Sequence, residues 1–130
     1  MNNKHSGAKE NIKILVVEDN EMFRRIAMEI LTRYESSSAK NIAEARKLIK
    51  KIKPDIIFLD IGLPDGNGID LIKEIKESTP ESFIVMLTSS NLKKDVKESK
   101  NQGADIYIIK PFSRQKIKDC IDAYKKAQNK

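Results

Sequence analysis

The chain has 130 residues, of which 39% are hydrophobic and 34% are charged, and it carries a formal net charge of +6. That length allows one domain with a substantial core, and no apolar stretch is long enough to span a membrane. Residues 1–10 lack the apolar centre of a secretory signal, and the single cysteine, Cys120, excludes an internal disulfide. These features predict a cytoplasmic globular domain.

The positive charge is concentrated in one stretch of the sequence. Residues 91–118 hold eight basic side chains against three acidic ones, which accounts for +5 of the net +6. A local excess of this kind indicates a basic surface rather than a generally basic protein. The basic residues are Lys93, Lys94, Lys97, Lys100, Lys110, Arg114, Lys116 and Lys118.

Apolar runs alternate along the chain with segments in which apolar residues recur at helical spacing. We expect residues 1–11 to form a disordered lead-in, residues 12–127 the folded domain, and residues 128–130 a short tail. Strands are predicted over 12–17, 36–40, 56–60, 83–87 and 105–109, and helices over 21–33, 41–51, 69–77, 91–102 and 113–126.

The first half of the chain contains elements of very different burial. The second strand, residues 36–40, is polar and is expected at an edge of the sheet. The third strand is a continuous apolar run that ends in Asp60, which is typical of a parallel strand buried on both faces. The first helix has a broad apolar stripe expected to face the core: Met22, Phe23, Ile26, Ala27, Ile30, Leu31 and Tyr34.

The last two helices also differ from each other. The helix over 91–102 has a thin apolar face of Leu92 and Val96 only, and Gly103 is its natural C-terminal cap. The final helix turns Cys120 inward, where it is expected to act as a small buried hydrophobe rather than as a nucleophile.

Five strand–helix units in strict alternation predict an α/β fold of the flavodoxin-like, doubly wound type. The expected five-stranded parallel sheet has the strand order 2-1-3-4-5, with right-handed crossovers and helices on both faces. Ligands of such folds bind at the edge where the carboxyl ends of the strands meet.

Four of the predicted strands run directly into polar side chains. The first ends in Glu18 and Asp19, the third in Asp60, the fourth in Thr88 and the fifth in Lys110. Parallel topology brings these ends to one edge, where three carboxylates would repel one another unless a cation lies between them. Mg²⁺ suits such a set of oxygen ligands, completed by water and a phosphate.

The ammonium of Lys110 and the hydroxyl of Thr88 would stabilise a transferring phosphoryl group at the same edge. Asp60 lies centrally enough to act as the nucleophile and form an aspartyl phosphate. Each residue alone has an ordinary alternative: a helix or turn cap for Glu18, Asp19 and Asp60, a strand end for Thr88, a solvated loop lysine for Lys110. Their joint occurrence favours a phosphoryl-transfer site.

With these residues in place, the sequence resembles the receiver domains of bacterial two-component response regulators, in particular the stand-alone, chemotaxis-regulator type. The resemblance covers residues 12 to about 125. The motifs that carry it are residues 15–20 (LVVEDN), 59–64 (LDIGLP) with Gly66 and Gly68, 87–89 (LTS), 103–105 (GAD) and 110–112 (KPF).

The resemblance implies that Asp60 accepts a phosphoryl group from a histidine kinase or a phosphotransfer protein. In receivers the carboxylates that match Glu18, Asp19 and Asp60 bind Mg²⁺, and the residue that matches Gly62 adds its backbone carbonyl. Three departures from the usual pattern stand out: a polar second strand, small residues at the variable positions 62 and 90, and an unusually basic fourth helix.

The resemblance also implies a switch. Thr88 and Lys110 match the residues that contact the phosphoryl oxygens, and Tyr107 matches the aromatic side chain that turns inward on activation. An ordinary strand aromatic is the alternative for Tyr107. The basic fourth helix lies on the surface of the fourth helix, fifth strand and fifth helix, which receivers commonly present to protein partners.

Three other functions fit these residues less well. A flavodoxin would need a phosphate-cradling loop where the acidic residues Glu18 and Asp19 stand. An aspartyl phosphatase usually has a second aspartate where this chain has Gly62, and a nucleic-acid binder would show a recognition motif beside its lysines. We therefore expect a signalling protein rather than an enzyme, acting without an output domain, without direct DNA or membrane binding, and as a monomer or a phosphorylation-dependent dimer.

Overall fold

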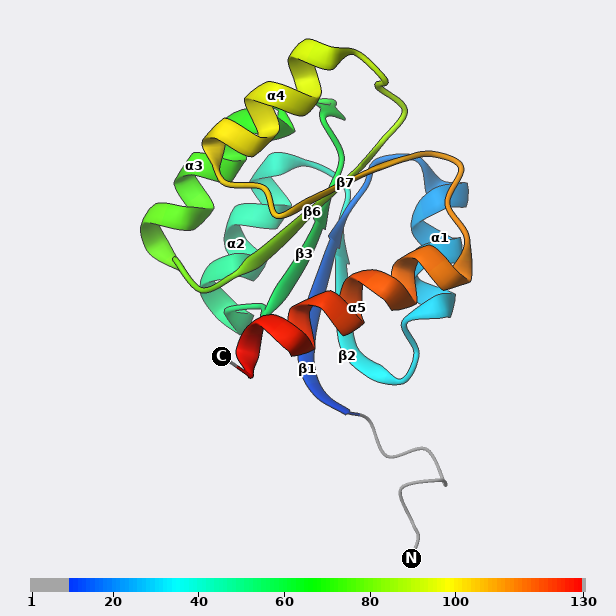
Figure 1. Cartoon of the computed structure of the whole chain (residues 1–130). Helices are drawn as coiled ribbons and strands as arrows, with labels where there is room; N and C mark the ends of the chain where they lie inside the picture. The colour runs from blue at the N-terminus through cyan, green and yellow to red at the C-terminus, as the bar shows by residue number, and fades with distance from the viewer. Residues whose placement is uncertain (1–9, 130) are drawn as a thin grey trace, which may run out of the picture.

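Three apolar runs of the sequence form the central strands of a five-stranded sheet, and a further strand lies on each side of them (Figure 1). The structure is a computed structural model that describes residues 10–129. The strands lie in the order β2-β1-β3-β6-β7, all parallel. This order confirms the predicted doubly wound fold, with β2 at an edge. Their bounds are β1 (Glu10–Val17), β2 (Tyr34–Ala39), β3 (Ile56–Leu59), β6 (Phe83–Thr88) and β7 (Ile106–Ile109).

Helices cover both faces of the sheet (Figure 1). One face carries α1 (Glu21–Ile30) and α5 (Arg114–Gln128), and the other carries α2 (Ile42–Ile52), α3 (Gly68–Ser78) and α4 (Lys93–Gln102). Because successive strand residues point to opposite faces, β1 contributes to two separate cores. Ile14 and Val16 pack on the α1/α5 side, and Leu15 and Val17 on the α2/α3 side.

The first strand and the last helix are both longer than predicted. β1 begins at Glu10 rather than at residue 12, because its amide donates to the carbonyl of Arg33 at 2.7 Å. The rest of the predicted lead-in, residues 1–9, lies outside the described residues. α5 continues to Gln128, where a tail was predicted, and Asn129 caps it; residue 130 is also outside the described part.

The boundary between α1 and β2 differs from the prediction. α1 ends at Ile30, three residues early, and β2 begins at Tyr34 instead of residue 36. Tyr34 was predicted to continue the apolar stripe of the helix, but it pairs with Glu10 at the start of the sheet and is buried there. Tyr34 therefore belongs to β2, because it pairs with β1, although its spacing fits the apolar stripe of the helix.

The apolar face of α1 is also narrower than predicted. Met22 and Ile26 are 59% and 41% exposed, although both were expected to face the core. Ala27 is buried, and Phe23 is half-buried beside the carboxyl edge of the sheet. The outer residues of the stripe thus form an apolar surface on α1.

The segment between Asp60 and α3, predicted as a loop, contains a small antiparallel hairpin. β4 (Gly62–Leu63) pairs with β5 (Gly66–Asn67). Asp65, in the turn of this hairpin, accepts hydrogen bonds from the amides of Ile42 and Ala43 at the start of α2, at 2.8 and 3.0 Å. The hairpin is therefore fastened to a helix some twenty residues earlier in the chain.

Most residues of α4 are not buried. It begins at Lys93 rather than at residue 91, and Leu92, expected to face inward, is its N-cap and is 52% exposed. Val96 is half-buried, and the buried residue of the helix is Ser99. In α5 the prediction holds, because Cys120 is buried and burial raises the pKa of its thiol to about 12.

Candidate functional site

The register of the central strands brings three acidic side chains together. Val17 of β1 pairs with Leu59 of β3, so the residues that follow them, Glu18 and Asp60, emerge at the same level. The Asp60 amide donates to the Val17 carbonyl at 3.1 Å and fixes this level. One carboxylate oxygen from each of Glu18, Asp19 and Asp60 lies within 4.8 Å of the others. The predicted convergence of the three carboxylates is therefore present.

The three carboxylates differ in their surroundings. Glu18 and Asp60 are 2% and 7% exposed, whereas Asp19 is exposed to solvent. Burial raises the pKa of Glu18, although the Lys110 ammonium and the Asn20 amide oppose this effect. Asp60 Oδ1 accepts a 2.7 Å hydrogen bond from the amide of the residue that follows it. The cluster is thus exposed to solvent at Asp19 and buried at Glu18 and Asp60.

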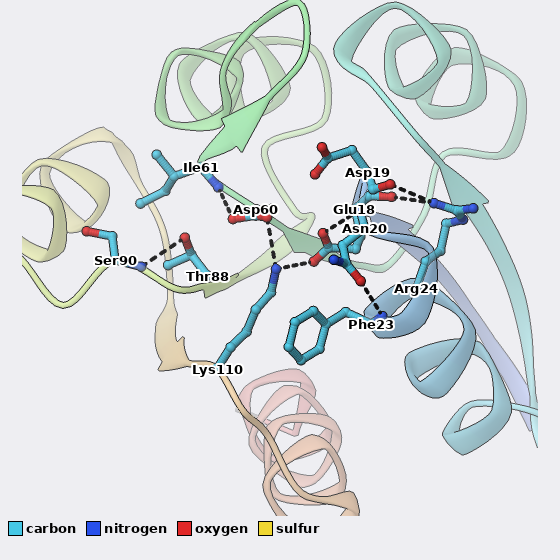
Figure 2. A network of polar contacts seen from close by, with 10 residues as sticks. All are labelled: Glu18, Asp19, Asn20, Phe23, Arg24, Asp60, Ile61, Thr88, Ser90 and Lys110. Atoms are coloured by element: carbon cyan, nitrogen blue, oxygen red, sulfur yellow. Dashed lines mark hydrogen bonds and ion pairs between the residues drawn. The ribbon is translucent and has the colours of Figure 1, made fainter.

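Lys110 reaches into this cluster from the end of β7. Its ammonium lies 2.5 Å from Glu18 Oε1 and 3.0 Å from Asp60 Oδ2, and its side chain is 6% exposed (Figure 2). Burial alone would lower the pKa of this lysine, but the two carboxylates outweigh burial and raise it. Lys110 is therefore a fixed cation beside Asp60 rather than a solvated loop lysine.

Thr88 completes the predicted set at the end of β6. It is 3% exposed, and its carbonyl accepts from the Lys110 amide at 2.8 Å. Its hydroxyl oxygen accepts a long hydrogen bond, 3.4 Å, from the Ser90 amide (Figure 2). The hydroxyl proton of Thr88 is consequently left for another acceptor at this edge of the sheet.

Two glycines shape the backbone next to Asp60. Gly62 lies exposed in β4, and an added Cβ there would meet no atom within 4 Å. At Gly68 an added Cβ would lie 1.9 Å from the carbonyl oxygen of Asp60, so only glycine fits. The sequence motif contains both residues, but the close approach of Gly68 to Asp60 is visible only in the fold.

Tyr107 lies between the site and α4. Its side chain is half-buried, burial raises its pKa, and its hydroxyl donates to the Ser90 carbonyl at 2.9 Å. Ser90 Oγ in turn contacts Asp95 Oδ2 in the first turn of α4 at 2.5 Å. Ser90, seen in the sequence only as a small residue at a variable position, thus connects Thr88, Tyr107 and α4.

Two residues of α1 belong to the site although the sequence did not indicate it. Arg24 Nη1 donates to the carbonyls of Glu18 and Asp19, at 3.0 and 3.3 Å, and so holds the acidic turn in place. The ring of Phe23 lies 4.6 Å below the Lys110 ammonium, measured to the ring centroid. An arginine and an aromatic residue on an amphipathic helix carry no local signal of such contacts.

The donor set fits a hard divalent cation. Three carboxylates meet at one point, one of them is open to solvent, and the oxygens are the ligands that Mg²⁺ prefers. A carboxylate beside a cation site, a buried ammonium and a hydroxyl can together accept and stabilise a phosphoryl group.

In residues 10–129 no helix is both long and apolar enough to cross a membrane.

Comparisons with known proteins point to one family. A family model described as "Response regulator receiver domain" matches residues 14–122. The chemotaxis protein CheY of Halobacterium salinarum is 36% identical over 111 residues, which cover 84% of this chain and 92% of that protein.

Solved structures extend the similarity to the fold. A two-component response regulator from Clostridium difficile has a TM-score of 0.88 at 30% identity, covering 92% of this chain and 100% of that one. A response regulator protein from Burkholderia pseudomallei, solved with a phosphorylated aspartic acid, a calcium ion and citrate, has a TM-score of 0.81 at 28% identity. The alignment covers 92% of this chain and 72% of that one.

Proposed function

This chain belongs to the response regulator receiver domain family, and we propose that Asp60 is its phosphoacceptor, with Glu18, Asp19 and the Gly62 carbonyl completing a Mg²⁺ site. Receiver domains act as phosphoacceptors in two-component signalling and are signalling proteins rather than classical enzymes. The acidic cluster at residues 18, 19 and 60 is typical of the metal site of this family. The observation that carries the assignment is the buried contact between Lys110 and Asp60 within that cluster.

The proposed reaction needs one bond to form and one to break. A carboxylate oxygen of Asp60 attacks the phosphorus of a phosphohistidine, the P–N bond breaks, and the imidazole leaves and takes up a proton. A Mg²⁺ ion held by the three carboxylates would neutralise part of the charge that otherwise resists the approach of an anionic donor. Two hydrogen bonds orient Asp60 for this attack. Its amide donates to the Val17 carbonyl of β1, and its Oδ1 accepts from the Ile61 amide.

The chain's own cation and hydroxyl would then stabilise the product. Phosphorylation adds about −1.5 to −2 charges at Asp60. The Lys110 ammonium, now shared between two carboxylates, can turn toward the new oxygens, and the unused proton of Thr88 can be donated to them. Because the side chain of the lysine is only 6% exposed, these contacts are stronger than they would be in water.

A receiver domain implies a histidine kinase as phosphoryl donor. We propose that the output passes to an acidic protein partner through α4, β7 and α5. Lys93, Lys94 and Lys97 on α4 are exposed, as are the apolar side chains of Leu92 and Ile109, at 52% and 43%. A basic surface with apolar residues on it suits an acidic partner, whose affinity should fall as salt rises.

Intact-mass measurement tests the assignment of the phosphoacceptor. With acetyl phosphate and Mg²⁺, the wild-type chain should gain one phosphoryl group, whereas Asp60→Asn should gain none, because the amide is not a nucleophile toward the donor. Asp70→Asn, on the exposed side of α3, is the matched control and should label like the wild type. Equal labelling of Asp60→Asn and the wild type would refute the assignment.

A further inference from the structure

Lys110 has a third neighbour besides its two carboxylates, and this neighbour is an aromatic ring. The ammonium lies 4.6 Å from the centroid of Phe23 and faces Asp60 Oδ2 at 3.0 Å (Figure 2). The face of an aromatic ring carries negative potential and attracts a cation at this distance. The contact is stronger here than at a surface, because the lysine side chain is 6% exposed.

Phe23 is itself held by two contacts, one at its backbone and one at its ring. Its backbone amide donates to Oδ1 of Asn20, the N-cap residue of α1, at 3.0 Å. Its ring packs against Phe112, with centroids 5.9 Å apart and a tilt of 44°. Phe112 follows Lys110 by two residues and packs against the core on the α1/α5 side. The aromatic pair therefore ties the start of α1 to the backbone that carries the lysine.

A lysine side chain has four rotatable bonds, and holding its ammonium at one point costs conformational entropy. Carboxylates alone would hold it, but they compete with an incoming phosphoryl oxygen for the same protons. A ring face offers attraction without accepting a conventional hydrogen bond, so it can keep the ammonium in place while its carboxylate contacts are exchanged.

We propose that Phe23 is a positioning residue for phosphoryl transfer, which holds the Lys110 ammonium beside Asp60 through the face of its ring, with Phe112 bracing the ring. The proposal rests on Asp60 as phosphoacceptor. It assigns to α1 a part in the chemistry of the site that its sequence, an ordinary amphipathic stripe, does not indicate.

The test compares variants that change the ring in different ways. Phe23→Leu keeps an apolar side chain but removes the ring, and should slow phosphorylation by acetyl phosphate about three- to tenfold. Phe23→Tyr keeps the ring and should stay within about twofold of the wild type. Replacing Phe23 by mono-, di- and trifluorinated phenylalanine preserves the shape but withdraws charge from the ring face, so the rate should fall stepwise with each fluorine. Met22→Leu, at the neighbouring exposed position, is the control and should not change the rate.

The chain contains no tryptophan, so the rate is best followed by intact mass or by phosphate-affinity electrophoresis rather than by intrinsic fluorescence. A second readout needs no phosphorylation: the ring current of Phe23 should shift the ε-methylene protons of Lys110 upfield, and Phe23→Leu should abolish this shift. A rate that is independent of fluorination, or a Phe23→Leu variant as fast as the wild type, would overturn the proposal. Those outcomes are distinct from failure of the phosphoacceptor assignment, in which the wild type itself gains no phosphoryl group at Asp60.

Discussion

The hydroxyl of Tyr107 donates a 2.9 Å hydrogen bond to the carbonyl of Ser90, so the tyrosine already points toward the loop between β6 and α4. The amide of the same serine is held by Thr88 Oγ1, and its hydroxyl contacts Asp95 of α4. Ser90 is therefore in contact with Thr88, with Tyr107 and with the first turn of α4.

We predict that phosphorylation acts on α4 through Ser90. If Thr88 turns toward the phosphoryl oxygens, its contact with the Ser90 amide is lost, and α4 is free to shift because little of it is buried. Amide hydrogen exchange with and without beryllofluoride should show protection changes concentrated between residues 88 and 112. Tyr107→Phe, which removes the hydroxyl but keeps the ring, should reduce the change in α4. Changes confined to α1 and α2 would contradict this route.

Mg²⁺ should stabilise the fold. Glu18 and Asp60 share the Lys110 cation, whereas Asp19 forms no ion pair with any residue from 10 to 129, so repulsion remains in the metal-free cluster. At a free concentration ten times its dissociation constant, the metal should add about 1.4 kcal/mol to the free energy of unfolding. This is several degrees in melting temperature for a domain of this size.

Asp19→Asn provides the matched variant for the metal experiment. Removing one of three like charges should raise the melting temperature without metal and weaken the response to Mg²⁺. The measurement is a thermal melt across a Mg²⁺ titration at constant ionic strength. A melting temperature that does not respond to Mg²⁺ at any concentration would mean that the carboxylates do not form a metal site.

Gly68→Ala should strain the backbone at Asp60. The added methyl group would lie 1.9 Å from the Asp60 carbonyl oxygen, so the backbone must move, at a cost of about 1–3 kcal/mol of stability. Gly62→Ala, six residues earlier, meets no atom within 4 Å and should change stability by less than about 0.5 kcal/mol. Urea unfolding of the two variants compares these values directly, and equal stability for both would show that the chain relaxes around residue 68 without strain.

Ser99→Ala should stabilise the domain. Ser99 of α4 is fully buried, and its hydroxyl has no hydrogen-bond partner among residues 10–129. Removing an unpaired buried hydroxyl should add about 1–3 kcal/mol to the free energy of unfolding. Asn101→Ala, on the exposed side of the same helix, measures the gain from helix propensity alone, which is a few tenths of a kcal/mol. If the two variants gain the same amount, the buried hydroxyl carries no penalty.

The polar side chains at the carboxyl ends of the strands could be predicted from the sequence. Apolar runs mark the buried strands, and parallel topology brings the ends of these strands together. Glu18, Asp60, Thr88 and Lys110 each follow such a run, so their meeting required no knowledge of side-chain contacts. The Tyr34 boundary could not be predicted, because the residue fits the helical stripe and its strand assignment depends on pairing with Glu10.

The contacts that tune the site were not predictable for a related reason. Phe23 looks like any apolar residue on an amphipathic helix, and only the fold places Lys110 against its ring. Leu92 was expected inward because it is apolar, but it precedes the first turn of α4 and points to solvent. Periodicity identifies which residues could be buried, whereas long-range packing decides which of them are.

The cap that Asp65 provides for α2 joins two parts of the chain into one unit of local unfolding. Opening the hairpin after Asp60 would strip the Ile42 and Ala43 amides of their acceptors, so the hairpin and the first turn of α2 should open and exchange together. The Ile42 amide is the main cause of the lowered pKa of Asp65. This stabilisation is therefore complete above the pKa that Asp65 has in the unfolded chain, and it is lost as the pH falls through the lower folded-state pKa. Acid should accordingly loosen the hairpin that follows Asp60 and the first turn of α2 at the same time.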